Sequence, residues 1–417
     1  MGKRWLQVAA KGFGFLLAAA LAAFSYSTPM RQIAALPDIV RLAPGEKADL
    51  PAMDLWLLGG QDTVPVRQSA DESLERTGSG TVSYRLFGRL PVRSIEVIES
   101  DLVYLVPGGD AVGITIKTQG VLVVGLGTVE TPSGPVSPAA AAGLEAGDWI
   151  LSVDDSAVTT GAELADRIAP GEARTLTVCR DGVEIQVLIH PAQSAEGPHR
   201  LGAWVRDSTA GVGTLSFLDT SSGWFAALGH PVSDIDTQET LLVREGRLVP
   251  AEIVDVVRGS QGTPGELMGV FSSAGISLGN INANTEYGIY GGVNPSGKDR
   301  TEQQIPMGYA FEAHAGEATL LSTISDRGVE SFSCQIVRVS TQDAPSTKGM
   351  VIQITDERLL GTTGGIVQGM SGSPVLQDGK LVGVVTHVFV NDPTRGYCVY
   401  AEWMHEEMMQ ARTDLKD

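Results

Sequence analysis

Short apolar runs recur through the C-terminal half of the chain, and Gly, Asn and Asp residues separate them. The clearest runs cover residues 212–217, 241–243, 253–257, 333–339, 350–354 and 382–388. Regularly spaced short strands joined by glycine turns are typical of all-β barrels and sandwiches. Helical periodicity is nearly absent until Tyr400. The sequence therefore predicts a mainly β unit over residues 196–417.

One loop in this unit has the composition of a nucleophile turn. Residues 369–374 are Gly-Met-Ser-Gly-Ser-Pro, and an Asp-Gly hairpin between two apolar runs follows them. The glycines allow backbone N–H groups to turn towards one point, where they could bind the oxyanion of a tetrahedral intermediate. The run resembles the Gly-X-Ser-Gly-Gly-Pro loop of chymotrypsin-like proteases, with Ser373 in place of the last glycine. Ser371 is our candidate nucleophile, and a plain turn is the alternative.

A serine hydroxyl needs a base at neutral pH, and histidine is the usual one because its pKa lies close to 7. His230 ends the aromatic and alanine-rich run of residues 224–229 and precedes Pro231. This position presents the imidazole at a strand end rather than in a core. We predict His230 as the general base, with a structural histidine in a turn as the alternative. His387 is the second candidate, and we expect it to form a wall of the substrate cleft.

A carboxylate is expected to orient the imidazole and stabilise its cation. The aspartates that follow His230 in the chain are candidates, and spacing does not decide among them: Asp234, Asp236, Asp255, Asp299, Asp326, Asp343 and Asp356.

Composition excludes several classes of function. The chain has 417 residues, of which 43% are hydrophobic, so it is long enough for two or three domains with their own cores. A formal net charge of -19 argues against nucleic acid as a partner, because phosphate binding needs clustered Lys and Arg. The three cysteines are far apart and form no metal-binding pattern, so we expect buried thiols, no metal and no cofactor.

The N-terminus has the pattern of an export signal. Lys3, Arg4 and Lys11 precede an uncharged stretch from Gly12 to Thr28 that is rich in Ala, Leu and Phe. We expect a signal anchor over residues 1–36 that leaves the rest of the chain outside the cytoplasm, and a cleaved signal peptide is the alternative. Residues 37–105 form a strand-rich region without visible chemistry.

The next region contains a more specific motif. Residues 137–154 have the sequence of a short helix, a glycine turn and a strand, and they resemble the PDZ domains of exported bacterial proteases. This resemblance predicts a PDZ domain over residues 106–195. Val112, Gly113 and Ile114 look like its carboxylate-binding loop, and residues 162–168 like the helix that walls the peptide groove. The alternative is that the loop only shapes the fold.

Five stretches together are similar to the stage IV sporulation protein B peptidases. They are His230 with residues 233–236, then residues 259–265, 348–350, 363–371 and 387–393. The resemblance implies a PDZ domain followed by a chymotrypsin-like double β-barrel behind an N-terminal membrane anchor. It also implies Ser371 as nucleophile, His230 as base and Asp356 as third member of the triad, with Asp234 or Asp236 as alternatives. By analogy with the clan, the N–H groups of Gly369 and Ser371 form the oxyanion hole.

The same resemblance implies a role in endospore formation. We expect an exported serine endopeptidase that cleaves itself, and that cleaves a membrane-bound regulator of an intramembrane metalloprotease in the forespore intermembrane space. The PDZ domain would regulate access or dock a substrate. Two alternatives remain: a non-catalytic PDZ-based binding platform, and a general envelope quality-control protease, although such proteases usually place the PDZ domain after the protease.

Overall fold

The computed structural model describes residues 39–42, 80–86, 90–99, 102–271, 276–294, 304–340, 342 and 345–415. The chain divides into two compact units, one formed by residues 1–103 with 341–343 and one by the remainder. In the first unit, β3 (Leu90–Glu99) pairs with both β1 (Ile39–Leu42) and β2 (Gly80–Leu86). The predicted anchor at residues 1–36 lies outside the described residues. None of the helices in the described part of the chain has the length and apolar character that a membrane crossing needs.

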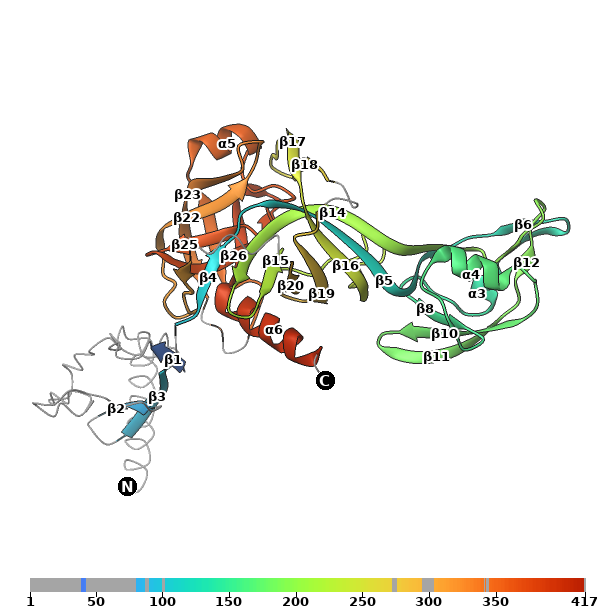
Figure 1. Cartoon of the computed structure of the whole chain (residues 1–417), viewed down its shortest axis with the longest axis horizontal. Helices are drawn as coiled ribbons and strands as arrows, with labels where there is room; N and C mark the ends of the chain where they lie inside the picture. The colour runs from blue at the N-terminus through green and yellow to red at the C-terminus, as the bar shows by residue number, and fades with distance from the viewer. Residues whose placement is uncertain are drawn as a thin grey trace, which may run out of the picture. The chain divides into compact units, whose positions relative to one another are not determined.

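The second unit contains a first ring of six strands (Figure 1). Its strands, in the order in which they pair, are β5 (Ala111–Leu126), β14 (Ala203–Asp219), β15 (Trp224–Ala227), β20 (Gly288–Val293), β19 (Gly279–Thr285) and β16 (Val243–Pro250). Because β16 pairs with β5, the ring closes. Apolar side chains from all six strands fill it, including Ile114, Leu215 and Phe225. Outside the ring, β4 (Tyr104–Pro107) pairs with β14 and with β21 (Ile305–Pro306).

A second closed barrel follows in the chain. Its strands, in pairing order, are β22 (Gly316–Thr323), β23 (Val329–Val339), β24 (Met350–Ile354), β27 (Asp392–Tyr400), β26 (Lys380–Phe389) and β25 (Pro374–Gln377). Numbered along the chain, both rings have the same strand order, 1-2-3-6-5-4. The predicted mainly β fold is therefore confirmed, with two six-stranded barrels. Helix α6 (Ala401–Asp414) begins directly after Tyr400, as expected.

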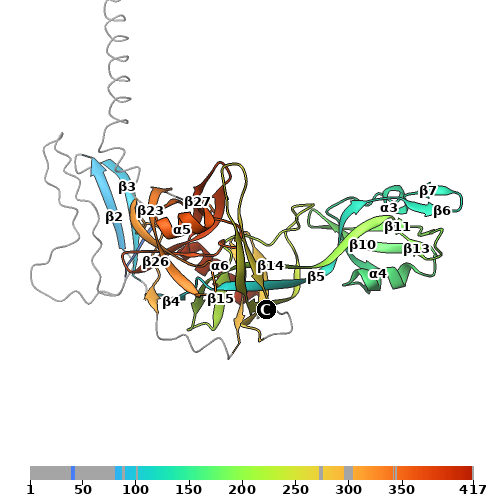
Figure 2. The ribbon, with the colours of Figure 1, turned by 90° about the horizontal axis from the view of Figure 1, so that it is seen from above.

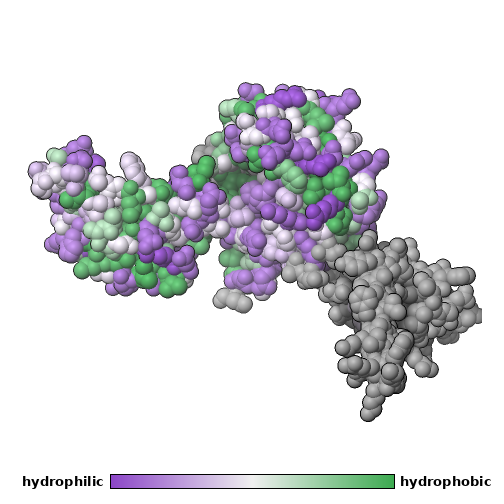
Figure 3. Space-filling view, turned by 180° about the vertical axis from the view of Figure 1, so that it is seen from behind, coloured by the Kyte–Doolittle hydropathy of each residue, from purple (hydrophilic) through white to green (hydrophobic). Residues whose placement is uncertain are grey.

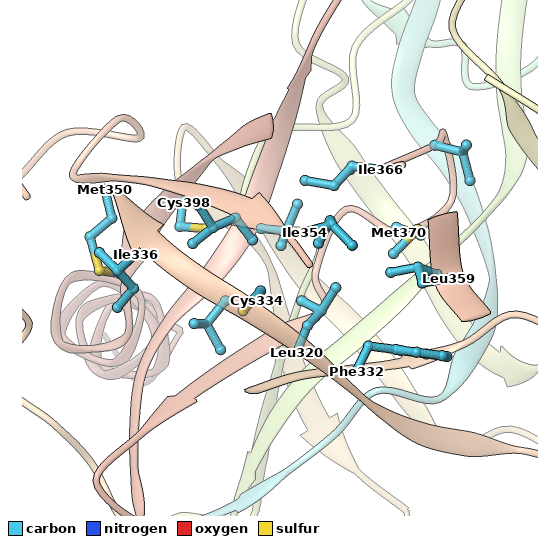
Figure 4. Packing of buried hydrophobic residues seen from close by; sticks show 14 of the residues in the cluster. Leu320, Phe332, Cys334, Ile336, Met350, Ile354, Leu359, Ile366, Met370 and Cys398 are labelled. Atoms are coloured by element: carbon cyan, nitrogen blue, oxygen red, sulfur yellow. The ribbon is translucent and has the colours of Figure 1, made fainter. Parts of the chain in front are cut away.

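The core of the second barrel follows from strand alternation. In β23, Phe332, Cys334 and Ile336 are buried while their neighbours are exposed, which is the period of two that a strand with one covered face requires. Figure 4 shows these residues packed with Met350 and Cys398. Burial raises the pKa of the Cys334 thiol to about 12, and Cys334 and Cys398 are buried as expected, whereas Cys179 is only partly buried. On the face drawn in Figure 3, apolar and hydrophilic residues are interspersed.

The PDZ fold includes the C-terminal half of β5 and the N-terminal half of β14. Its remaining elements are β6 (Val129–Thr131), β7 (Gly134–Val136), α3 (Pro138–Ala141), β8 (Trp149–Val153), β9 (Ser156–Ala157), α4 (Gly161–Ile168), β10 (Arg174–Arg180), β11 (Val183–Ile189), β12 (Ala192–Gln193) and β13 (His199–Arg200). Helix α4 starts at Thr160, whose side chain accepts the N–H of Glu163 as an N-cap. Its buried Leu164 and Ile168 pack against Val121 and Leu176.

The PDZ fold is an insertion in the first barrel. Strand β5 pairs with residues 203–214 of β14, from Thr214 opposite Ala111 to Ala203 opposite Leu126, and Figures 1 and 2 show the two strands side by side. The N-terminal half of β5 and the C-terminal half of β14 belong to the barrel. The other half of each strand belongs to the PDZ fold. The chain therefore passes through the first barrel before it enters the PDZ domain, whereas the sequence predicted a complete PDZ domain over residues 106–195 followed by the protease.

Candidate active site

Ser371 lies on the loop between α5 (Glu357–Thr363) and β25, at the junction of the two barrels. Met370 beside it is fully buried and anchors the loop in the second barrel core, next to Leu359 and Ile366 (Figure 4). Gly372 has a φ of +101°, and a Cβ there would lie 2.1 Å from the Thr214 carbonyl oxygen, so only glycine fits. The half-buried Ser371 hydroxyl donates a hydrogen bond of 3.0 Å to the carbonyl oxygen of Thr386.

The backbone of this loop leaves two amides unused. The N–H groups of Gln368, Met370 and Gly372 donate to carbonyl oxygens at 2.8 to 3.1 Å. Within the described ranges, no acceptor is found for the N–H groups of Gly369 and Ser371, which alternate with them. These are the two amides that the sequence predicts for the oxyanion hole. A substrate carbonyl oxygen would give both of them an acceptor.

His230 follows β15 of the first barrel. Leu228 and Gly229 before it both have a φ of +73°, and this tight turn directs the chain against β26. The Nδ1 atom of His230 lies 2.8 Å from the carbonyl oxygen of Pro231. Since a carbonyl oxygen only accepts, Nδ1 carries the proton of the neutral ring, and Nε2 is left with its lone pair as a base. Burial lowers the pKa of His230, against a smaller opposite effect of the Pro231 carbonyl.

His387 and its neighbour Thr386 contact the two predicted residues, His230 and Ser371. Its ring centroid lies 5.3 Å from that of His230, with an angle of 39° between the planes. It follows Thr386 directly in β26, and the Thr386 carbonyl accepts the Ser371 hydroxyl. Ser371 and His230 therefore converge on residues 386–387. In this conformation the Ser371 hydroxyl is bound to Thr386 rather than to an imidazole.

The predicted third member of the triad has a different set of partners. Asp356 is the N-cap of α5, where its carboxylate accepts the N–H groups of Arg358 and Leu359. It also accepts the N–H of Ser333 at 3.3 Å and pairs with the Arg358 guanidinium at 3.1 Å. Although burial opposes it, hydrogen bonds from Arg358, Leu359 and Ser333 lower the pKa of Asp356. The structure thus uses this carboxylate as a helix cap and does not bring it to His230.

The alternative carboxylates also bind elsewhere. Asp234 is buried and accepts the N–H groups of Asp236 and Thr237, and Arg206 of β14 pairs with both Asp234 and Asp236. Since the Pro231 carbonyl occupies Nδ1 of His230, none of Asp234, Asp236 and Asp356 has its side chain on this nitrogen among the described residues.

Asn284 in β19 holds the His230 segment in place, and sequence reasoning missed it. Its side-chain oxygen accepts the N–H of Val232 at 2.8 Å. Its side-chain nitrogen donates to the carbonyl oxygens of Val232 and Leu241, at 2.8 and 2.9 Å. One amide therefore ties both ends of the loop that follows His230. A single Asn near a strand end carries no local signal of this role.

The predicted PDZ carboxylate loop is wrong. Val112 and Ile114 are buried in the first barrel, and Val112, Gly113 and Ile114 pair with β14 on one side and β16 on the other. A Cβ on Gly113 would lie 2.2 Å from the ring of Phe271, so this backbone is covered. Neither its edges nor its faces can receive a peptide.

An unpaired strand edge lies instead at the N-terminal end of β14, within the described residues. Among the described residues, no strand pairs with the second edge of residues 203–207, which faces helix α4. The Asp207 carboxylate accepts the N–H of Gly161 at 2.9 Å and so fixes the start of α4 beside this strand. The preceding Gly202 has a φ of +72°. The predicted helix is thus present as α4, and the strand beside it is β14.

Comparisons with known proteins agree with this organisation. A family model described as SpoIVB peptidase S55 matches residues 197–405, and a PDZ domain model matches residues 131–180. No curated protein matches the chain.

Three solved structures are similar to parts of the chain. The PDZ domain of the SdrC-like protein from Listeria monocytogenes is 24% identical over 22% of this chain and 90% of its own, with a TM-score of 0.18. The thermostable serine protease AL20 from an extremophilic microorganism is 10% identical over 49% and 91%, with a TM-score of 0.31. The Rv3671c protease of M. tuberculosis, in its inactive form, is 13% identical over 48% and 84%, with a TM-score of 0.26.

Proposed function

Since the chain belongs to the SpoIVB peptidase S55 family and is a serine endopeptidase, we propose that Ser371 is its nucleophile and His230 its general base. The observation that carries this proposal is the convergence of Ser371 and His230 on residues 386–387, at the junction of the two barrels. Each residue comes from a different barrel, so the site exists only when both barrels are folded.

The proposed reaction begins with a rotation of the Ser371 side chain. The Ser371 hydroxyl turns from the Thr386 carbonyl towards Nε2 of His230, which takes its proton as Oγ attacks the carbonyl carbon of the peptide bond. The oxyanion binds the N–H groups of Gly369 and Ser371. His230 then donates the proton to the leaving amine, and a water molecule repeats the sequence to hydrolyse the acyl-enzyme. The Nδ1 to Pro231 hydrogen bond keeps the imidazole in the required tautomer throughout.

Two neighbouring serines provide the test. In the full-length protein, Ser371→Ala and His230→Ala are each expected to lower turnover by a factor on the order of 10⁶. Ser373→Ala is the matched control, because the buried Ser373 hydroxyl binds Ser322 rather than the site. The readouts are peptide hydrolysis and labelling by a fluorophosphonate. An active, labelled Ser371→Ala variant would disprove the proposal.

The chain acts on a protein or peptide, as a protease with a PDZ domain does. We propose that its substrates include itself and a membrane-bound regulator of an intramembrane metalloprotease during sporulation. We also propose that the protease acts outside the cytoplasm behind an N-terminal anchor, in the forespore intermembrane space. The family name supports the sporulation role. The positively charged, then apolar, N-terminal sequence supports export.

The PDZ peptide site is proposed at the free edge of residues 203–207. An extended peptide would add there as a strand between β14 and α4, with backbone hydrogen bonds on one side and the helix on the other. Trp204 on this strand is largely exposed. The supporting observation is the unpaired edge beside α4, whereas the loop of Val112, Gly113 and Ile114 is paired on both edges.

A further inference from the structure

One residue outside the predicted site is bonded to both catalytic segments. Thr214 lies in β14 with only 1% of its surface exposed. Its hydroxyl donates to the carbonyl oxygen of Gly369 at 2.7 Å, and its N–H donates to the carbonyl oxygen of Ser371 at 3.1 Å. Its own carbonyl oxygen accepts the N–H of Leu228 at 3.2 Å. Leu228 is two residues before His230, so Thr214 joins the nucleophile loop to the histidine turn.

The Gly369 backbone needs such an external support. Gly369 has a φ of +92° and no side chain, so the two peptide planes on either side of it rotate easily. The plane before it carries the N–H proposed for the oxyanion hole. The carbonyl of this same peptide plane belongs to Gln368. It accepts the N–H of Leu267 in β18 (Glu266–Val270) at 2.9 Å. In a trans peptide the N–H points opposite to the carbonyl, so this bond sets the direction of the Gly369 N–H.

The plane after Gly369 is held at its carbonyl by Thr214 and at its N–H by the bond from Met370 to the carbonyl oxygen of Val367. Among the described residues, the Thr214 hydroxyl is the donor found for the Gly369 carbonyl. A valine at this position has nearly the same shape and no donor, so the carbonyl would lose its partner while the packing stayed similar. The second plane would then be held by the Met370 N–H alone, through its 3.1 Å bond to the Val367 carbonyl oxygen, and the Gly369 carbonyl could tilt away from its present direction.

We infer that Thr214 is a positioning residue that fixes the oxyanion-hole loop in register with the His230 turn. This inference rests on the proposed function of Ser371 and His230. Thr214 touches no reacting atom. It acts through the orientation of Gly369 and through the distance between the nucleophile loop and the histidine, both of which matter more in the transition state than in substrate binding.

The test is a series of Thr214 variants that differ in donor strength. Thr214→Val is expected to lower kcat about tenfold and leave KM within about twofold, because a transition-state interaction is weakened rather than removed. Thr214→Ser keeps the hydroxyl and is expected to restore most of kcat. Thr214→Cys, with a weak S–H donor, is expected to fall between them. The rate of fluorophosphonate labelling of Ser371 should follow the same order.

Thr118→Val is the matched control. Thr118 is also buried, and its hydroxyl also binds backbone carbonyl oxygens, but at the start of the PDZ insertion. It should change the melting temperature without changing kcat. The inference fails if Thr214→Val keeps full kcat, or if kcat in the series follows melting temperature rather than donor strength. Ser371→Ala, measured beside it, separates the outcomes: a dead Ser371→Ala with a fully active Thr214→Val overturns only the role of Thr214.

Discussion

The two histidines at the barrel junction lie in surroundings that disfavour their charged forms. Burial lowers the pKa of His230. Burial also lowers the pKa of His387, and the nearby His230 and Lys348 add to this effect. If either ring were protonated, its charge would lie close to the other imidazole, since the two ring centroids are 5.3 Å apart. Both imidazoles are therefore neutral at neutral pH, which is the form that a general base requires.

The pH dependence of hydrolysis follows from this. The base acts only when neutral, so activity is lost as pH falls through the pKa of His230. Because that pKa is lowered, the acid limb of kcat/KM is expected below the ordinary histidine value of about 6.5. The measurement is kcat/KM against pH with a neutral peptide substrate.

His387→Gln is the control for this profile. It removes the second titrating ring and leaves His230, so an acid limb below 6.5 should persist. A midpoint at or above 6.5 in the parent protein would contradict the buried, neutral base. Disappearance of the limb in His387→Gln would assign it to His387 instead.

At the scale of elements, helix α5 connects Asp356 to the nucleophile loop. Asp356 caps its N-terminus, Leu359 is buried in the second barrel core, and Gly364 ends it in the left-handed region. Asp356→Ala should therefore lower the free energy of unfolding by about 1 kcal/mol, whereas Asp356→Asn, which also caps helices, should lower it less. Thermal unfolding of both variants measures this.

The activity of the same pair decides the triad assignment. If Asp356 is only a cap, Asp356→Asn should hydrolyse peptides nearly as well as the parent protein. A loss of roughly 10⁴ in turnover at an unchanged melting temperature is the effect of removing a triad carboxylate, and it would restore Asp356 to that role.

The elements show what the sequence could and could not predict. The sequence singled out Ser371 and His230 because their signals are local, a glycine-rich turn and a strand end before proline, and their catalytic roles are our proposal. The hydrogen bonds of Asn284 and Thr214 could not be predicted, since each joins residues far apart in the chain. The strands were predictable from alternation, as in β23. The position of Val112, Gly113 and Ile114 in the barrel could not be predicted. The long strand β5 belongs to both folds, and its periodicity does not mark where one fold ends and the other begins.

At the scale of the molecule, the PDZ insertion contacts the loop after His230. Leu122 and Trp149 of the PDZ fold pack with Leu241, and Arg206 pairs with Asp234 and Asp236. Asn284 holds the same loop from the barrel side. The segment that carries the proposed base is therefore fixed by the PDZ fold and by the barrel together.

Excision of the insertion tests this arrangement. Lys117 and Ser208 face each other on β5 and β14, so Asn-Gly in place of residues 118–207 would join them as a hairpin. We expect both barrels to fold and Ser371 to react with a fluorophosphonate. We expect kcat to fall several-fold because the loop loses Arg206 and the apolar contacts of Leu241. Near-UV circular dichroism and active-site labelling are the measurements, with Ser371→Ala in the same background as control. An unfolded product would contradict the hairpin interpretation.

The inserted domain is connected to the first barrel through two neighbouring, paired strands rather than through a single linker. A cut at any one of its loops would leave both fragments bound to the same barrel through β5 and β14. Self-digestion there would give a nicked protein that separates into pieces in denaturant but migrates as one particle under native conditions. Loss of the intact band on a denaturing gel would therefore not by itself show that the enzyme had been destroyed.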